Sequence, residues 1–457
     1  MHLLKIAVAA SFTCVALSGC VSNGRPQASL DPPIKLDVTV QSNEMVVATY
    51  RLAKPTDALH YAQYLGGYRS QDWQPEESSF VWIKEGDGER IVRADGKPFR
   101  SLTLTIPIRY RSLPKSYAPF SPFSEGSALI HTGQFHACLT VPCDGTDALP
   151  IEIAATGKII GVGGRRVADR TSFVSSGDGT NAFLGTLAPV EADGFVGIID
   201  PGLPTAVQDH LKASLPRAMV DFARIYGALS FRPELYVSID ARPRKDGKES
   251  TQGGTLPGQI FMHFDGATAR KRISEGSPFW LDWFFAHEAA HLFQQDKAGG
   301  LIGDDKAAWI HEGGADAMAA LALLQRGSGE QTYVAGRVNA AETACAKGLA
   351  IAPLDQATAA GNFDLHYQCG LLIWLALDGE LRGVKQNGLH ALNKTMFTLM
   401  KAGAPRNERT FLSAAEKVGV SRALLRSIEK LSRGGYADSK VEIAGLRKRM
   451  ALDSKLN

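Results

Sequence analysis

The order of apolar and polar residues divides the chain into a strand-rich half and a helical half. Between residues 34 and 199, short apolar stretches alternate with Gly-rich turns, and apolar side chains recur at every second position from Leu102 to Tyr110. This period places them on one face of a β-strand, although Pro107 restricts that strand to a sheet edge or a bulge. The pattern predicts an α+β protein whose N-terminal domain, residues 34–199, is β-sandwich-like.

After residue 200 the apolar period becomes helical. Residues 205–226 fit a helix that is interrupted near Pro216, and two strands are expected at 234–239 and 258–264. The apolar and aromatic stretch from Phe279 to Phe293 then indicates a buried helix. We expect it to lead, through a loop with Gly and Asp, into a second helix that spans residues 309–324.

The C-terminal part, residues 385–457, is predicted to be helical and amphipathic. Its basic face at residues 441–456 is interpreted as solvated. A second domain is therefore expected at residues 200–384. The balance of 50 basic and 47 acidic residues, a net charge of +3, does not suggest nucleic-acid binding. With 44% hydrophobic residues, a chain of 457 residues can bury more than one core.

The N-terminus has the pattern of a bacterial lipoprotein signal. A short basic stretch precedes an apolar segment, residues 6–17, that is too short to span a bilayer comfortably, and Leu17-Ser-Gly-Cys20 matches the lipoprotein cleavage box. We predict a signal peptide at 1–19, lipidation of Cys20 and a tether at 20–33. The alternative is an ordinary secretory signal. Because Val21 is not Asp, the expected location is the outer membrane of the cell envelope, facing the periplasm.

Two cysteines leave the count of six if Cys14 is removed with the signal and Cys20 carries lipid. The other four can form structural disulfides in an oxidising compartment, and three pairings are possible. Pairing of sequence neighbours is favoured: Cys138 with Cys143, and Cys345 with Cys369. A cysteine metal site is disfavoured, because no pair has the close spacing that zinc prefers.

The predicted buried helix contains the motif His-Glu-x-x-His, formed by His287, Glu288 and His291. Residues four apart project from one helix face, so both imidazoles can bind one metal ion. Glu288 can take a proton from an activated water without being a ligand. A chance match with core histidines is the alternative, but ionisable groups are costly to bury unless they are paired or metal-bound. The motif therefore predicts a zinc site.

Glu312, near the start of the second predicted helix, is the expected third ligand. Catalytic zinc takes three protein ligands and keeps its fourth position for water. Asp316, one turn further, is expected to accept the distal N–H of one ligand histidine, and His311 is expected to do the same for the other. An ordinary helix-start carboxylate is the alternative interpretation of Glu312. Asp316 is then the first substitute as ligand.

These motifs resemble the gluzincin zinc metallopeptidases, in particular their aminopeptidase N-like and glycyl-aminopeptidase-like branches, with thermolysin more distant. The resemblance rests on His-Glu-x-x-His followed by Trp309-Ile-x-Glu-Gly-x-x-Asp316, and it covers roughly residues 256–381. It implies a zincin catalytic domain at 200–384, one zinc ion per chain and a peptide or protein substrate. Hydrolysis would use a metal-activated water, with Glu288 as the general base.

The resemblance also implies an oxyanion donor. Tyr367 and Gly370 match the Tyr-x-Lys-Gly element whose tyrosine hydroxyl stabilises the oxyanion in those peptidases, although Cys369 replaces the usual Lys. Tyr333 and His366 are the alternative donors.

One element of the aminopeptidases does not match. The segment that carries their amine-binding glutamate has no carboxylate here between Thr251 and Phe264. Either Asp265 or Glu275 takes that role, or a free N-terminus is not required. We expect residues 258–264 to form the sheet edge along which a peptide can pair. The alternative function is a gluzincin-fold lipoprotein that has lost turnover and acts as a binding or scaffolding protein in the cell envelope.

Overall fold

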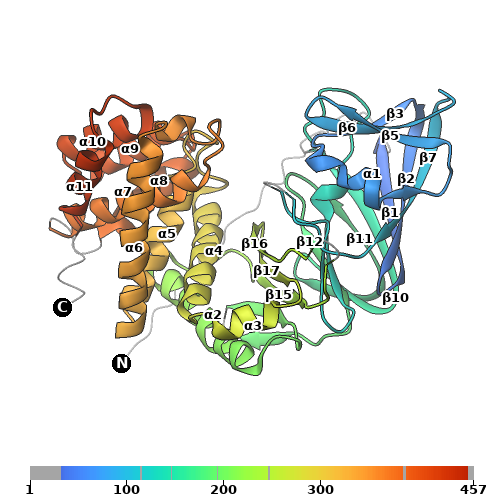
Figure 1. The fold of residues 1–457 in the computed structure, drawn as a ribbon, viewed down its shortest axis with the longest axis horizontal. Helices are drawn as coiled ribbons and strands as arrows, with labels where there is room; N and C mark the ends of the chain where they lie inside the picture. Colours follow the sequence, from blue (N-terminus) through green and yellow to red (C-terminus); the bar gives the residue numbers. More distant parts are fainter. Residues whose placement is uncertain are drawn as a thin grey trace, which may run out of the picture.

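The computed structural model describes residues 32–113, 116–145, 147–192, 194–244, 247–383 and 388–450. The predicted signal peptide, Cys20 and nearly all of the tether lie outside these residues. Figure 1 shows the N-terminal strands on the right and the helices α4–α11 on the left, with β15–β17 between them. The predicted α+β organisation, with an N-terminal β-rich domain and a helical C-terminal part, is confirmed.

The β-rich domain contains a nine-stranded sheet and a three-stranded sheet. The large sheet has the order β4-β7-β2-β1-β10-β12-β9-β8, with β11 paired to β10, and the small sheet has the order β3-β6-β5. The strands are β1 (Ile34–Ser42), β2 (Met45–Thr56), β3 (Ala58–Tyr61), β4 (Gln74–Pro75), β5 (Phe80–Glu85), β6 (Gly88–Arg93), β7 (Phe99–Pro107), β8 (Phe120–Pro122), β9 (Ala128–His131), β10 (Leu149–Val162), β11 (Arg165–Ser175) and β12 (Asn181–Gly185). Short helical turns are η1 (Leu65–Gly67), α1 (Tyr68–Asp72) and η2 (Thr132–Phe135).

Both sheets share one core, as a sandwich-like arrangement requires. Tyr50 and Leu104 from the large sheet and Leu59 and Ile91 from the small sheet are buried in the same cluster. Strand β7 shows the predicted alternation, and it ends at Pro107, where the ladder no longer needs a backbone N–H.

A five-stranded sheet follows, with the order β13-β14-β15-β17-β16. Its strands are β13 (Val190–Ala192), β14 (Phe195–Ile199), β15 (Glu234–Asp240), β16 (Ser250–Leu256) and β17 (Gln259–Asp265). β14, β15 and β17 are parallel, and β16 runs antiparallel to β17 at the edge. β13 and β14 belong to this sheet, although both precede residue 200, the position at which we expected the first domain to end and the second to begin.

The predicted sheet edge at residues 258–264 is wrong. That segment forms β17, which lies between β15 and β16 and is buried along its whole length, whereas β16 is the edge strand. The physical reason is visible in the composition of the two strands. A strand with neighbours on both sides and both faces covered is mostly apolar, as β17 is from Ile260 to Met262 and at Phe264, whereas β16 is rich in Gly, Thr and Gln.

Helices make up most of the remaining chain. They are α2 (Thr205–Tyr226), α3 (Ala269–Glu275), α4 (Phe279–Ala298), α5 (His311–Leu324), α6 (Ser328–Leu349), η3 (Leu354–Gln356), α7 (Asp364–Arg382), α8 (Gly388–Lys401), α9 (Glu408–Val418), α10 (Arg422–Arg433) and α11 (Ser439–Arg447). The expected interruption of α2 is wrong, because this helix continues through Pro216. Among the described helices, none has the length and apolar character that a membrane crossing requires.

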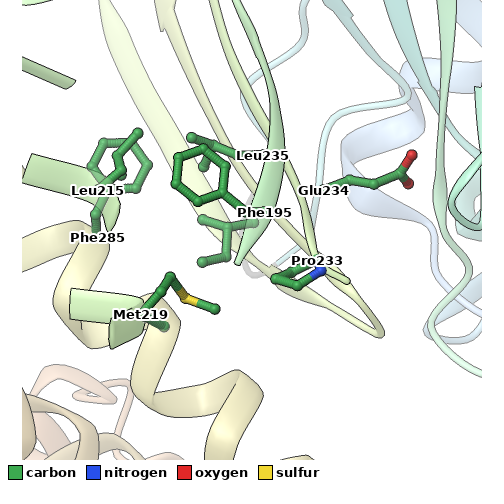
Figure 2. A pocket seen from close by; sticks show the side chains of 9 residues that line it. Phe195, Leu215, Met219, Pro233, Glu234, Leu235 and Phe285 are labelled. Atoms are coloured by element: carbon green, nitrogen blue, oxygen red, sulfur yellow. The ribbon is translucent and has the colours of Figure 1, made fainter. Parts of the chain in front are cut away.

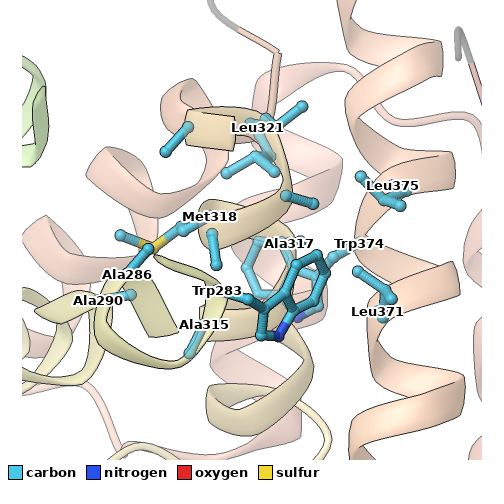
Figure 3. Packing of buried hydrophobic residues seen from close by; sticks show 14 of the residues in the cluster. Trp283, Ala286, Ala290, Ala315, Ala317, Met318, Leu321, Leu371, Trp374 and Leu375 are labelled. Carbon is cyan, nitrogen blue, oxygen red and sulfur yellow. The ribbon is translucent and has the colours of Figure 1, made fainter. Parts of the chain in front are cut away.

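Small residues allow α4 and α5 to pack closely. Figure 3 shows Ala286 and Ala290 of α4 beside Ala315 and Met318 of α5, with Trp374 of α7 on the other side. These residues are buried in one large core that continues through the C-terminal helices. From Phe279 to Phe293, α4 is mostly apolar and aromatic, and most of its residues are buried in this core.

Both predicted disulfides are present. Cys138 bonds to Cys143 within one loop of the β-rich domain, and Cys345 in α6 bonds to Cys369 in α7. The second bond ties α6 to the helix that carries Tyr367.

A small apolar cavity lies behind α4, between α2 and the five-stranded sheet. Its volume is about 20 Å³, and its lining includes Phe285 and Ala289 of α4. In Figure 2 the carboxylate of Glu234 points away from the apolar side chains, and it accepts a hydrogen bond from Gln259 at 2.9 Å. The cavity contains no residue of the predicted metal site and has room for about one water molecule.

Candidate metal centre

The helix α4 presents the motif residues from its buried surface. His287, Glu288 and His291 are only 6%, 7% and 8% exposed, within a helix whose other buried residues are mostly apolar. Isolated ionisable groups are costly at such positions, so their partners determine what the site can do.

The three predicted ligands converge. The possible ligand atoms of His287, His291 and Glu312 all lie within 4.8 Å of one another. Glu312 Oε2 is 3.0 Å from His291 Nε2 and 3.3 Å from His287 Nε2, and the two Nε2 atoms are 2.9 Å apart. Glu312 occupies the second position of α5, so α4 and α5 together form the group.

Each histidine is held through its other ring nitrogen. Asp316 Oδ1 lies 2.9 Å from His287 Nδ1 and also accepts a hydrogen bond from Trp283 Nε1 at 2.8 Å. Gln294 Oε1 lies 3.0 Å from His291 Nδ1. Because a carboxylate or amide oxygen can only accept, both Nδ1 atoms carry hydrogen, and both Nε2 lone pairs face the shared space.

The position predicted for Asp316 agrees with the structure, but that of His311 does not. Gln294, rather than His311, lies against His291, and its Nε2 donates to the carbonyl of His311 at 3.1 Å. His311 itself lies 3.4 Å from Glu312 Oε1. The reason is helical spacing. Gln294 is three residues after His291 on the same face of α4, so its side chain reaches the histidine without a contact from α5.

Glu288 has a partner from the edge strand. The hydroxyl of Thr255 in β16 donates to Glu288 Oε2 at 2.7 Å and lies 3.1 Å from the carbonyl of Glu288. This contact fixes the carboxylate next to the histidine pair without consuming its second oxygen. Glu288 is therefore oriented as a proton acceptor beside the ligand group rather than within it.

Tyr367 lies beside the group, as its sequence match implies. Its ring centroid is 5.7 Å from that of His287. Burial and the carboxylates of Glu312 and Glu288 raise the pKa of Tyr367 well above its ordinary value, so its hydroxyl stays protonated and can donate. The two alternatives lie elsewhere: Tyr333 packs against Trp283, and His366 Nε2 is 3.2 Å from the hydroxyl of Thr358.

The charges of the site favour a cation. Although burial alone would raise it, the pKa of Glu312 is held well below its ordinary value by His291, His287 and His311. Burial likewise opposes protonation of His287, but Asp316, Glu312 and Glu288 raise its pKa well above the usual range. Buried carboxylates around two imidazoles thus attract positive charge, as either protons or a metal ion.

Sequence reasoning missed three supporting residues: Thr255, Gln294 and Trp283. The contact of Gln294 with His291 could have been predicted, because Gln294 follows this histidine by three residues, a spacing that brings side chains together on a helix. The roles of Thr255 and Trp283 could not be predicted, because they depend on where β16 and α5 lie relative to α4.

A buried helix with two histidines, and a glutamate from the next helix, fits the class of catalytic zinc sites that have His₂Glu ligands. No protein-family model and no curated protein matches the chain. Among solved structures, it is similar to native yeast LTA4 hydrolase, with 13% identity and a TM-score of 0.51, covering 88% of this chain and 67% of that one.

The same yeast enzyme in complex with bestatin aligns with 14% identity and a TM-score of 0.52, over 90% of this chain and 70% of that one. An M1 zinc metallopeptidase from Deinococcus radiodurans aligns over 88% of this chain and 92% of that one, with 13% identity and a TM-score of 0.46. At these identities, the likeness to yeast LTA4 hydrolase shows the fold alone.

Proposed function

We propose that this chain is a zinc-dependent metallopeptidase that hydrolyses peptide bonds with an activated water. The observation that carries the proposal is the convergence of His287, His291 and Glu312 beside a separately held Glu288. The fold that the chain shares with yeast LTA4 hydrolase supports it.

The donor set fits zinc. Both Nδ1 atoms face acceptors, so two unprotonated Nε2 atoms and one carboxylate oxygen point at a common position, and such a group is unfavourable without a proton or a cation. Zinc held by these three residues would act as a Lewis acid that polarises a peptide carbonyl and makes a water easier to deprotonate.

The protein's own residues supply the proton transfers. Glu288, oriented by Thr255, accepts the proton of the attacking water and delivers it to the leaving amine. Tyr367 keeps its proton at neutral pH and donates a hydrogen bond to the oxyanion that develops on the carbonyl.

Metal analysis combined with a peptide-library assay tests this proposal. We expect one zinc per purified chain, turnover that a chelator abolishes, and recovery on addition of zinc. Glu288→Gln should retain the zinc and lose hydrolysis, because the amide keeps the shape of the side chain but cannot accept a proton. A zinc-loaded wild-type protein that cleaves no member of the library would favour the binding or scaffolding alternative.

We also propose that the chain is anchored to the cell envelope through lipid on Cys20, which is supported by the cleavage box Leu17-Ser-Gly-Cys20. Cys20→Ala should release the protein from the membrane fraction or block its maturation. Lipid labelling that persists in this variant would refute the proposal.

A further inference from the structure

A loop of the β-rich domain reaches the edge strand of the second sheet. Gln252 of β16 holds this loop from both sides: its Oε1 accepts from the backbone N–H of Ala118 at 2.8 Å, and its Nε2 donates to the carbonyl of Ser116 at 3.0 Å. Tyr117 lies between these two contacts. The β-rich domain therefore places the side chain of Tyr117 against β16, the strand whose Thr255 donates a hydrogen bond to Glu288.

The ring of Tyr117 packs against Phe261 of β17 and His131 of β9, at centroid distances of 4.8 and 5.4 Å. Its hydroxyl lies over Gly254, since a Cβ added there would be only 2.3 Å from that oxygen. The next residue is Thr255, the partner of Glu288. Successive residues of a strand point to opposite faces, so Tyr117 and Glu288 lie against neighbouring residues of the edge strand from its two faces.

A buried polar network fixes the position of this loop. Gln134 Nε2 donates to the carbonyl of Tyr117 at 2.7 Å and to the hydroxyl of Ser116 at 2.8 Å. Gln134 Oε1 accepts from Tyr68 at 2.6 Å and from Arg69 at 3.2 Å. Buried polar groups are costly unless their partners are in place, and a satisfied network of this kind confines the loop to one conformation.

The hydroxyl of Tyr117 is available to donate a hydrogen bond. Within the described part of the chain, the structure gives it no hydrogen-bond partner. Burial, Glu288 and Glu312 raise the pKa of Tyr117, so the group remains a donor at neutral pH. A neutral hydroxyl donor of this kind fits a hydrogen-bond acceptor such as a peptide carbonyl.

The strand beside it has backbone groups to offer a peptide. β16 pairs with β17 on one side only, and an extended peptide can add to such an edge by main-chain hydrogen bonds. We propose that Tyr117 is a substrate-positioning residue, whose hydroxyl donates a hydrogen bond to a main-chain carbonyl of a peptide lying along β16. The β-rich domain then completes the substrate site. This inference rests on the proposed peptidase function.

The inference is tested by measuring peptide binding to a variant of the protein that cannot hydrolyse the peptide. The parent is the full-length, zinc-loaded Glu288→Gln protein, and the probe is a library peptide that the wild type cleaves. Adding Tyr117→Phe removes one oxygen and keeps the ring contacts. We expect the Kd from calorimetry to rise about 3- to 10-fold, the usual worth of one hydrogen bond, with zinc content and Tm unchanged.

Tyr110→Phe is the matched control. Tyr110 also comes from the β-rich domain and stacks on β17, with its ring 4.6 Å from that of His263, two residues from Phe261. This variant should leave the Kd unchanged. The inference is overturned if Tyr117→Phe binds as tightly as the parent, or if Tyr110→Phe weakens binding equally. A zinc-loaded protein that neither binds nor cleaves any peptide would instead overturn the proposed function, and this inference with it.

Discussion

The backbone of Gly370 in α7 fills the space that a side chain on Gly313 in α5 would need. A Cβ built on Gly313 would lie 2.3 Å from both Cα and the carbonyl carbon of Gly370, and one built on Gly370 would lie 2.7 Å from Cα of Gly313. Glu312 adjoins the first glycine, and Tyr367 precedes the second by about one helical turn. This contact between two helix backbones therefore sets the spacing of Glu312, the proposed third ligand, and Tyr367, the proposed oxyanion donor.

Gly313→Ala should destabilise the protein and weaken the metal site. The added methyl group meets backbone, which cannot rotate away, so we expect a loss of about 1–3 kcal/mol or more in the free energy of unfolding. Chemical denaturation and zinc content are the measurements. Gly336→Ala in α6 is the control, because a Cβ there meets no atom within 4 Å and helix propensity should rise. Equal effects of the two substitutions would show that the α5–α7 contact is not tight.

Glu312→Ala should sharply lower zinc occupancy, because two histidines alone make a poor site. The fold should survive, since Asp316 and Gln294 still hold His287 and His291. Zinc content after dialysis measures this, with Glu275→Ala on the exposed surface of α3 as the control. Full occupancy in Glu312→Ala would move the third ligand to Asp316.

The sequence was most informative where the contacts are local. His287 and His291 share a helix turn, so their common face follows from helical geometry alone. The positions of Glu312 and Asp316 were also predictable, because the ligand helix follows the motif helix after a short loop. Local spacing also favoured the correct disulfides.

Contacts between distant segments could not be predicted. Tyr117 and Gln252 are 135 positions apart, and no periodicity of either segment indicates that they meet. The edge strand was misplaced for a related reason. The sequence of β17 has the apolar residues expected of a strand, and the sequence of β16 does not. The strand with the weaker β-strand pattern, β16, is nevertheless the one that lies at the edge of the sheet.

Tyr367→Phe should lower turnover by roughly 10²–10³ while leaving KM and zinc content nearly unchanged, the usual effect of deleting one oxyanion donor. Steady-state kinetics on a library-derived peptide measures the change. Tyr333→Phe is the control, because that ring packs against Trp283 rather than His287. Normal turnover in Tyr367→Phe would show that another residue donates to the oxyanion.

Acid should destabilise the protein partly through His263. Burial lowers the pKa of this histidine to about 3, whereas in the unfolded chain it lies near 6.5. The unfolded state therefore binds the proton first, and stability falls as the pH drops below about 6.5. In His263→Gln, the dependence of unfolding free energy on pH should be shallower by up to about 1.4 kcal/mol per unit between pH 6 and pH 4. Parallel curves from urea titrations would contradict this.

Finally, peptides with a blocked N-terminus should be cleaved at rates comparable to those of free peptides. A strict aminopeptidase needs a carboxylate to neutralise the α-ammonium, and β16 supplies none. The two other candidates do not face the site: Asp265 is paired with Arg244 at 2.7 Å, and Glu275 is exposed on α3 near Lys271. Rates on matched acetylated and free peptides decide the question. A strict requirement for a free amino group would mean that an acid outside this strand binds it, and the protein would then be an aminopeptidase.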